Sequence, residues 1–125
     1  MRLASRPFPR SCRLLRADEY AAVFSFRRAL RGEHFLLHYG EERKEGEEGA
    51  RLGLVIGKKF MRRAVGRNTV KRVAREAFRQ MRVLLPCRDW VLRLATKLPK
   101  PDRALRRELA AEISQLLTRA ADRKP

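Results

Sequence analysis

Apolar residues recur along the chain with two periods, and the change of period separates helices from strands. Spacings of three and four residues predict a short helix beginning near Asp18, a long helix over residues 64–84 and a third from Asp102 to about residue 121. Alternating or continuous apolar runs predict strands at residues 34–39, 51–59 and 89–95. The predicted order is α, β, β, α, β, α. We expect one domain, because 125 residues can bury a single core.

The long helix has an apolar face and a basic face. At about 100° per residue, the apolar face spans roughly 140° and the basic flank roughly 100°. The apolar face contains Val70, Val73, Ala74, Ala77, Phe78 and Met81. The basic flank contains Asn68, Lys71, Arg72, Arg75, Arg79 and Arg82. Like charges four residues apart repel by about a few tenths of a kcal/mol per pair, so this flank favours a bound polyanion over a merely solvated surface.

Composition supports a folded protein with a basic surface. The net charge is +17 while 44% of the residues are hydrophobic, which favours a packed core over general disorder. Arg outnumbers Lys 24 to 7, and guanidinium groups suit bidentate contact with phosphate, so nucleic acid is favoured over a membrane. Residues 57–82 hold ten bases and one acid, whereas residues 41–50 carry a net charge of −3. We expect the acidic stretch to be a solvated hairpin loop.

Metal, disulfide and membrane chemistry have little support in the sequence. Cys12 and Cys87 form no CxxC pair, and His34 and His38 lie in a predicted strand, so we expect no metal site. No apolar stretch approaches the roughly 20 residues that span a bilayer, so we expect a soluble protein.

The two ends of the chain differ in composition from its middle. The first seventeen residues lack acids, as in an organelle transit peptide, but Pro7 and Pro9 would interrupt the helix that such a peptide needs. We therefore predict a flexible basic arm over residues 1–13, a folded domain over residues 14–121 and a tail over residues 122–125.

The basic segment carries a specific motif. A strand ending in two lysines is followed by Ala-Val, Arg-Asn, Lys-Arg and Arg-Glu-x-Phe-Arg. The matching residues are Lys58, Lys59, Ala64, Val65, Arg67, Asn68, Lys71, Arg72, Arg75, Glu76, Phe78 and Arg79. In this pattern the chain resembles the protein subunit of bacterial ribonuclease P. The likeness covers nearly the whole chain, but Thr69 stands where that family normally has Arg, and Gly57 where it has Ser.

The resemblance implies a fold and an activity. The fold is α/β (α+β): a single compact domain with a central mixed sheet of about four strands, three helices and a left-handed β-α-β crossover. The fourth strand would come from splitting residues 27–39. The activity is endonucleolytic removal of the 5′ leader from precursor tRNA, with catalysis by an RNA subunit and no catalytic side chain in the protein. Mg²⁺ would be held mainly by RNA, the location would be cytoplasmic, and no obligate protein partner is inferred.

The resemblance and the charge pattern together predict two binding surfaces. The surface for the catalytic RNA would comprise Lys58, Lys59, Arg62, Arg63, Arg67, Asn68, Lys71, Arg72, Arg75, Arg79 and Arg82. The leader of precursor tRNA would lie in a cleft between the first helix and the sheet, beside Tyr20, Phe24 and Phe35. Stacking of a base on an aromatic ring contributes about 1 to 3 kcal/mol. Packing in the core is the competing interpretation for all three aromatic residues.

Three other functions fit part of the pattern. A structural RNA-binding protein, such as a ribosomal protein, shares the charge and the core but gives no reason for the full motif. A DNA-binding helix-turn-helix needs a short helix just before the basic helix, where Lys58 and Lys59 belong to a predicted strand. A basic helix on an anionic membrane would need its apolar face free of the core.

Overall fold

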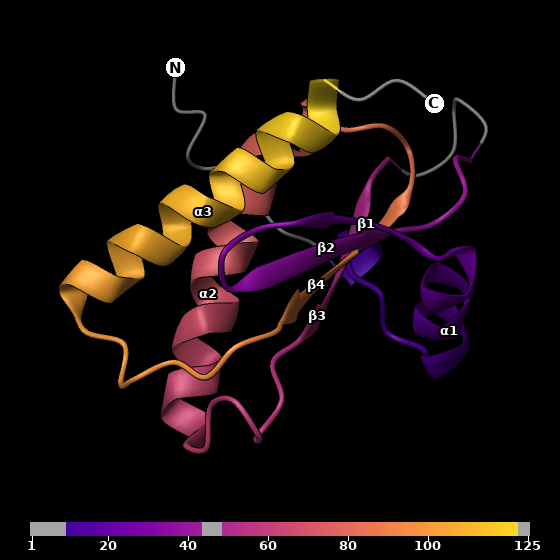
Figure 1. The fold of residues 1–125 in the computed structure, drawn as a ribbon. Helices are drawn as coiled ribbons and strands as arrows, with labels where there is room; N and C mark the ends of the chain where they lie inside the picture. The colour runs from indigo at the N-terminus through magenta and orange to yellow at the C-terminus, as the bar shows by residue number, and fades with distance from the viewer. Residues whose placement is uncertain (1–9, 44–48, 123–125) are drawn as a thin grey trace.

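A four-stranded sheet separates three helices into two unequal layers in the computed structural model of the chain (Figure 1). The structure describes residues 10–43 and 49–122. The helices are α1 (Ala17–Phe26), α2 (Ala64–Met81) and α3 (Arg103–Asp122), with short 3-10 helices η2 (Arg10–Cys12) and η3 (Arg82–Leu84). The strands are β1 (Arg28–Arg31), β2 (Phe35–Tyr39), β3 (Arg51–Val55) and β4 (Asp89–Leu94).

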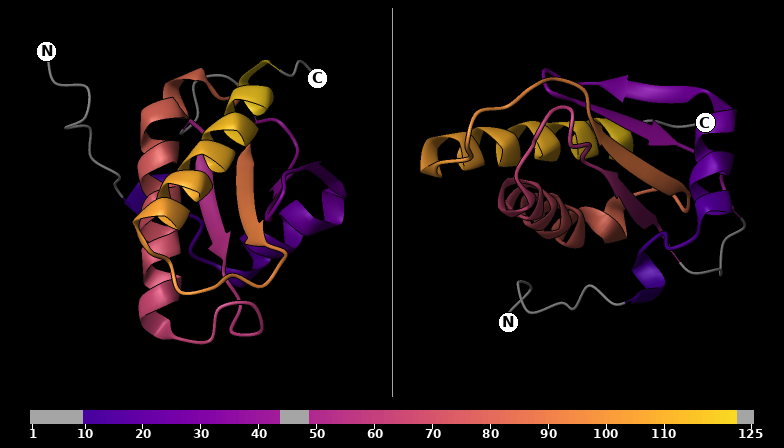
Figure 2. Two further views of the ribbon diagram at one scale, coloured as in Figure 1. Left: turned by 60° about the vertical axis from the view of Figure 1, so that its left-hand side comes forward. Right: turned by 90° about the horizontal axis from the view of Figure 1, so that it is seen from below.

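The sheet is mixed, with the strand order β1-β2-β4-β3. Strands β1 and β4 each pair antiparallel with β2, whereas β3 and β4 are parallel neighbours joined through α2. In the left view of Figure 2, β3 and β4 run down the page with α2 and α3 on the viewer's side, and β4 lies to the right of β3. The crossover is therefore left-handed, against the usual preference.

The fourth strand arises where the chain reverses after α1. Arg27 adopts a left-handed conformation with φ of 58° and donates its N–H to the carbonyl of Phe24, which ends the helix. Strand β1 follows at once and pairs with β2 through a short turn at Gly32. The expected splitting of residues 27–39 into two strands is confirmed.

The main core lies between the sheet and the layer formed by α2 and α3. Phe78 of α2, Leu109 of α3 and Leu37 of β2 are each 0% exposed. In α2 the predicted apolar face is confirmed: Val70, Ala74, Ala77 and Phe78 are buried, and Val73 and Met81 pack against them. The N-cap prediction for α3 is also confirmed, because Asp102 Oδ1 accepts the N–H of Leu105 at 2.8 Å.

The opposite face of the sheet is covered by α1 and by the chain just before it. A small cluster of Leu14, Val23 and Val91 is buried there. The Leu14 N–H donates to the carbonyl of Leu52 at 2.9 Å, and Cys12 is 2% exposed. Residues 10–13, which the sequence assigns to a basic arm, thus form a 3-10 helix and a bridge to β3; residues 1–9 lie outside the described residues.

Candidate nucleic-acid interface

The loop between β3 and α2 presents four of the predicted RNA-binding cations to solvent. Lys58, Lys59, Arg62 and Arg63 are all exposed. The carbonyl of Gly57 accepts the N–H groups of residues 60 and 61, which makes the loop a tight turn. This turn places the cations just before α2, whose N-cap is Arg63.

Two predicted RNA-binding arginines are used partly within the protein. Arg67 Nη1 donates to the carbonyls of Met61 at 3.0 Å and Arg62 at 2.7 Å, which ties the loop to α2. Arg82 Nε donates to the carbonyl of Ala50 at 2.7 Å and joins the end of α2 to the start of β3. Both guanidinium groups therefore position elements of the fold, a role that helical spacing did not reveal.

The remaining basic flank of α2 borders a hollow of about 360 Å³, which we call the arginine hollow. Its lining residues are Arg13, Asn68, Arg72, Arg75, Glu76 and Arg79. Arg13 belongs to the segment before α1. Its bridge to Leu52 of β3 brings it beside the residues of α2 that line the hollow. Helical spacing within α2 does not reveal Arg13, because this residue lies in the segment that the sequence predicts to be a flexible arm.

Electrostatics in the arginine hollow favour an anionic ligand. Burial, followed by the charge of Arg13, lowers the pKa of Arg75. Glu76, the one acid in the lining, is already paired with Arg79 and accepts a hydrogen bond from Gln80. Hydrogen bonding from Arg79 is the main cause that lowers the pKa of Glu76. Four guanidinium groups around one paired carboxylate make a site where phosphate would relieve repulsion.

On the other side of the sheet, Tyr20 anchors α1 to β3. Its hydroxyl accepts the N–H of Leu54 at 3.2 Å and lies 3.5 Å from the carbonyl of Leu14. The ring lies directly over Gly53, where an added Cβ would be 2.7 Å from the ring carbons. Glycine at this position is required by the close approach of the ring. Tyr20 is half-buried, and its contacts serve the packing of α1 on the sheet.

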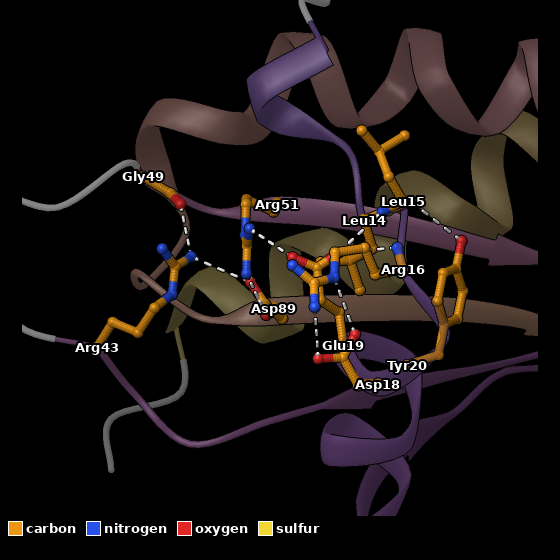
Figure 3. Close-up of polar contacts among 10 residues, drawn as sticks. All are labelled: Leu14, Leu15, Arg16, Asp18, Glu19, Tyr20, Arg43, Gly49, Arg51 and Asp89. Carbon is orange, nitrogen blue, oxygen red and sulfur yellow. Dashed lines mark hydrogen bonds and ion pairs between the residues drawn. The ribbon is translucent and has the colours of Figure 1, made fainter.

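A polar network fixes the start of α1 on β3 and β4 (Figure 3). Glu19 Oε1 accepts the N–H groups of Leu15 and Arg16 at 2.9 and 3.0 Å, while its other oxygen pairs with Arg51 at 3.1 Å. These contacts, led by the N–H of Leu15, lower the pKa of Glu19. Arg51 also makes two hydrogen bonds of 2.8 Å to Asp89. The network holds α1, and the aromatic residues it carries, in one position against the sheet.

Phe24 and two residues of the sheet form an aromatic and cationic patch beside α1. Phe24 is 37% exposed and meets the ring of His38 edge-on, with 4.9 Å between ring centroids. Arg93 Nε donates to His38 Nε2 at 3.2 Å. Burial and then the charge of Arg93 lower the pKa of His38. Sequence reasoning missed His38 and Arg93 because only strand register brings them together, with His38 opposite Val91.

The structure corrects the predicted place of Phe35. This residue is 1% exposed and packs in the main core on the side of α2 and α3. Alternation along β2 puts Phe35, Leu37 and Tyr39 on that face and leaves His38 on the face of α1. Phe35 therefore does not face the α1 side of the sheet, where the leader cleft is predicted, whereas Tyr20 and Phe24 belong to α1 itself.

The cluster that resembles a metal site has a structural role. Among the described residues, Glu33, His34 and Glu112 are the one group of potential ligands that come close together. Glu112 Oε2 accepts the N–H groups of His34 and Phe35 at 2.7 and 2.9 Å, and Oε1 lies 2.8 Å from His34 Nδ1. Both carboxylate oxygens are thus occupied in joining α3 to the turn between β1 and β2.

The structure argues against the membrane-surface and helix-turn-helix interpretations of the basic helix. The apolar face of α2 is buried in the main core, so it is unavailable to a membrane surface. Within the described parts of the chain, no helix has the length and apolarity to cross a bilayer. The segment before α2 is a turn following β3, which is not the paired helix of a helix-turn-helix protein.

A basic α/β domain that offers an arginine-rich helix and an aromatic patch belongs to the class of RNA-binding proteins. The family model of ribonuclease P matches residues 8–121, and the chain belongs to this family. It is 48% identical over 124 residues to the ribonuclease P protein component of Burkholderia mallei, covering 94% of this chain and 88% of that protein. It is 40% identical over 125 residues to the component of Ralstonia pickettii, with coverage of 94% and 87%.

Solved structures agree with this assignment. The RNase P protein from Thermotoga maritima superposes with a TM-score of 0.64 at 27% identity, covering 90% of this chain and 98% of that one. The chain is a protein component of the ribonuclease P ribonucleoprotein, and its partner is the RNA of that particle.

Proposed function

We propose that RNA carries the catalysis in this ribonucleoprotein, and that the protein assists by holding the catalytic RNA and the 5′ leader of precursor tRNA. The observation that carries this proposal is the division of α2 into a buried apolar face and the arginine hollow. Such a surface attracts RNA phosphates in a salt-dependent and largely sequence-independent way.

The leader would bind beside α1. Phe24 offers a partly exposed ring, and Arg93 supplies positive charge within the same patch. A base can stack on such a ring while the backbone follows the cation, which is the usual arrangement for single-stranded RNA. The network around Glu19 and Arg51 would keep this surface preorganised.

Mg²⁺ would be held mainly by RNA phosphates, and the protein would act in the cytoplasm without an obligate protein partner. The protein's contribution to metal use would be indirect. By neutralising RNA phosphates, the basic surface would lower the Mg²⁺ concentration at which the RNA folds and cleaves.

The test measures cleavage of a precursor tRNA by a bacterial ribonuclease P RNA, with and without the protein, across a range of Mg²⁺ concentrations. We expect no cleavage by the protein alone and a lower Mg²⁺ requirement when the protein is added to the RNA. Cleavage by the purified protein in the absence of RNA would overturn the proposal.

RNA recovered with the protein from cells separates this function from that of a structural ribosomal protein. We expect ribonuclease P RNA to be enriched. Enrichment of ribosomal RNA alone would favour the alternative.

A further inference from the structure

A second hollow, of about 650 Å³, lies at the start of α2 and shares no lining residue with the arginine hollow. We call it the apolar hollow. Its walls are the loop between β3 and α2, the first turns of α2, and the segment that leads into α3. The lining residues are Lys59, Phe60, Met61, Arg62, Arg63, Val65, Gly66, Thr69, Lys97, Leu98, Lys100 and Pro101.

The walls of the apolar hollow are fixed by contacts within the protein. Leu98 N–H donates to the carbonyl of Phe60 at 3.2 Å, which joins two walls that are far apart in sequence. An added Cβ at Gly66 would lie 2.6 Å from the sulfur of Met61, so the loop packs closely on α2. Thr69 donates its hydroxyl to the carbonyl of Val65 at 2.9 Å, which keeps this short side chain against the helix. The hollow is therefore present before any ligand binds.

The interior of the hollow offers apolar surface to solvent. Val65 is 77% exposed, the largest exposed fraction among the large hydrophobic residues of the described chain. Phe60 and Leu98 are partly buried and continue the same surface. A β-branched residue left this exposed near a helix N-terminus has no role in the core.

The rim of the hollow is cationic throughout. Its five charged lining residues are Lys59, Arg62, Arg63, Lys97 and Lys100, and all five are exposed. The lining contains no acid. A ligand that matches this arrangement has a flat apolar part and at least one negative charge beside it.

We propose that the apolar hollow takes one unpaired nucleotide of the ribonuclease P RNA, with its base against Val65 and Leu98 and its flanking phosphates on the rim. RNA is favoured over other anions because the rim residue Arg63 is the N-cap of α2, the helix that also carries the basic residues of the arginine hollow. Proteins recognise RNA largely through such unstacked bases. The proposal rests on the proposed function, and it assigns that RNA a contact which the arginine hollow does not supply.

The experiment measures affinity of the full chain for a bacterial ribonuclease P RNA at several salt concentrations. Val65→Asn removes apolar contact without changing charge, and we expect it to weaken binding about fivefold with an unchanged salt slope. Val83→Asn is the matched control, since Val83 is 67% exposed in η3, just beyond the far end of α2. We expect Val83→Asn to leave affinity unchanged.

A second pair of variants tests the rim. Lys97→Gln with Lys100→Gln should lower the magnitude of the salt slope by about one or two. Arg103→Gln with Arg107→Gln, two exposed residues of α3, is the control and should change the slope less. Circular dichroism and urea unfolding establish that each variant folds as the unaltered chain does.

The outcomes separate the two proposals. If the unaltered chain does not bind the RNA, the proposed function fails. If it binds and Val65→Asn binds equally well, the apolar hollow takes no nucleotide and this inference alone is overturned. Vesicles containing phosphatidylglycerol provide the remaining arm: loss of vesicle binding by Val65→Asn, with RNA affinity unchanged, would assign the hollow to a membrane instead.

Discussion

The two faces of the sheet are built differently. The face toward α2 and α3 is sealed by a continuous core that contains Phe35, Phe78 and Leu109, each at most 1% exposed. The face toward α1 has a three-residue buried cluster, and beside it lie ion pairs and the patch of Phe24, His38 and Arg93. One face therefore supplies most of the apolar burial that holds the fold, and the other leaves polar and aromatic groups available for binding.

This difference shows how a small protein can carry a net charge of +17 and stay folded. Apolar burial is concentrated between the sheet and two helices, where no charge is needed. Cations lie at the surface instead, on the outer flank of α2, in the loop before it and on the exposed side of α3. Repulsion among those on α2 then acts on a surface that RNA can neutralise.

The largest expected effect is a loss of stability from a substitution in the core between the sheet and helices α2 and α3. Phe78→Ala should lower the free energy of unfolding by about 3 to 5 kcal/mol, because it leaves a cavity in a core that cannot collapse fully. The matched change on the other face is Phe24→Ala, whose ring is 37% exposed. We expect it to cost less than about 1.5 kcal/mol. Urea unfolding measures both, and equal losses would contradict the comparison.

A smaller effect is expected where α1 meets the sheet. Gly53→Ala places a Cβ 2.7 Å from the ring of Tyr20. Displacing that ring should cost about 1 to 3 kcal/mol. Gly57→Ala is the control, because an added Cβ there meets no heavy atom within 4 Å. If the two variants unfold at the same urea concentration, Tyr20 does not anchor α1 as described.

A further effect is expected on RNA binding by the basic flank of α2, whose opposite side packs in the main core. Arg72→Ala with Arg75→Ala should weaken RNA binding about tenfold at moderate salt and lower the magnitude of the salt slope by about one or two. Stability should change little, because neither side chain belongs to the core. Arg103→Ala with Arg107→Ala on α3 is the control. An unchanged slope in the first variant would place the RNA elsewhere.

The smallest effect concerns pH on the face of α1. The pKa of His38 is lowered by burial and by Arg93, so the unfolded chain binds more protons than the folded one as pH falls below 6.5. Stability should be full above pH 6.5 and should fall as pH drops toward the folded pKa. Urea unfolding between pH 5 and 8 measures this loss, and His38→Asn should reduce it. An unreduced loss would assign it to another group.

Local patterns were enough to predict the helices. The apolar face of α2 and the cap at Asp102 depend on spacings of three to four residues within one helix, and these spacings are fixed by helical geometry. The family was also recognisable, because its motif lies within one continuous segment from Lys58 to Arg79. The basic flank of α2 could be drawn from the sequence for the same reason.

Side-chain partners across the fold could not be predicted in this way. Whether Arg67 and Arg82 bind RNA or protein carbonyls depends on where the loop and β3 lie, which helical spacing does not specify. Arg13 joined the arginine hollow only because the segment before α1 pairs with β3. Phe35 was misplaced because a continuous apolar run gives no indication of which residue faces which side of the sheet.

The sequence by itself determined the helices, the separation of apolar from basic residues on α2, and membership of the ribonuclease P family, since all of these rest on contiguous residues. Only the tertiary structure decided which side of the sheet each strand residue faces and which arginines donate hydrogen bonds to backbone carbonyls. It also decided that two hollows lie beside α2. The physical reason is that hydrogen bonds and ion pairs act over a few ångströms. Their partners are set by strand register and helix packing, which bring together residues that are distant in the chain.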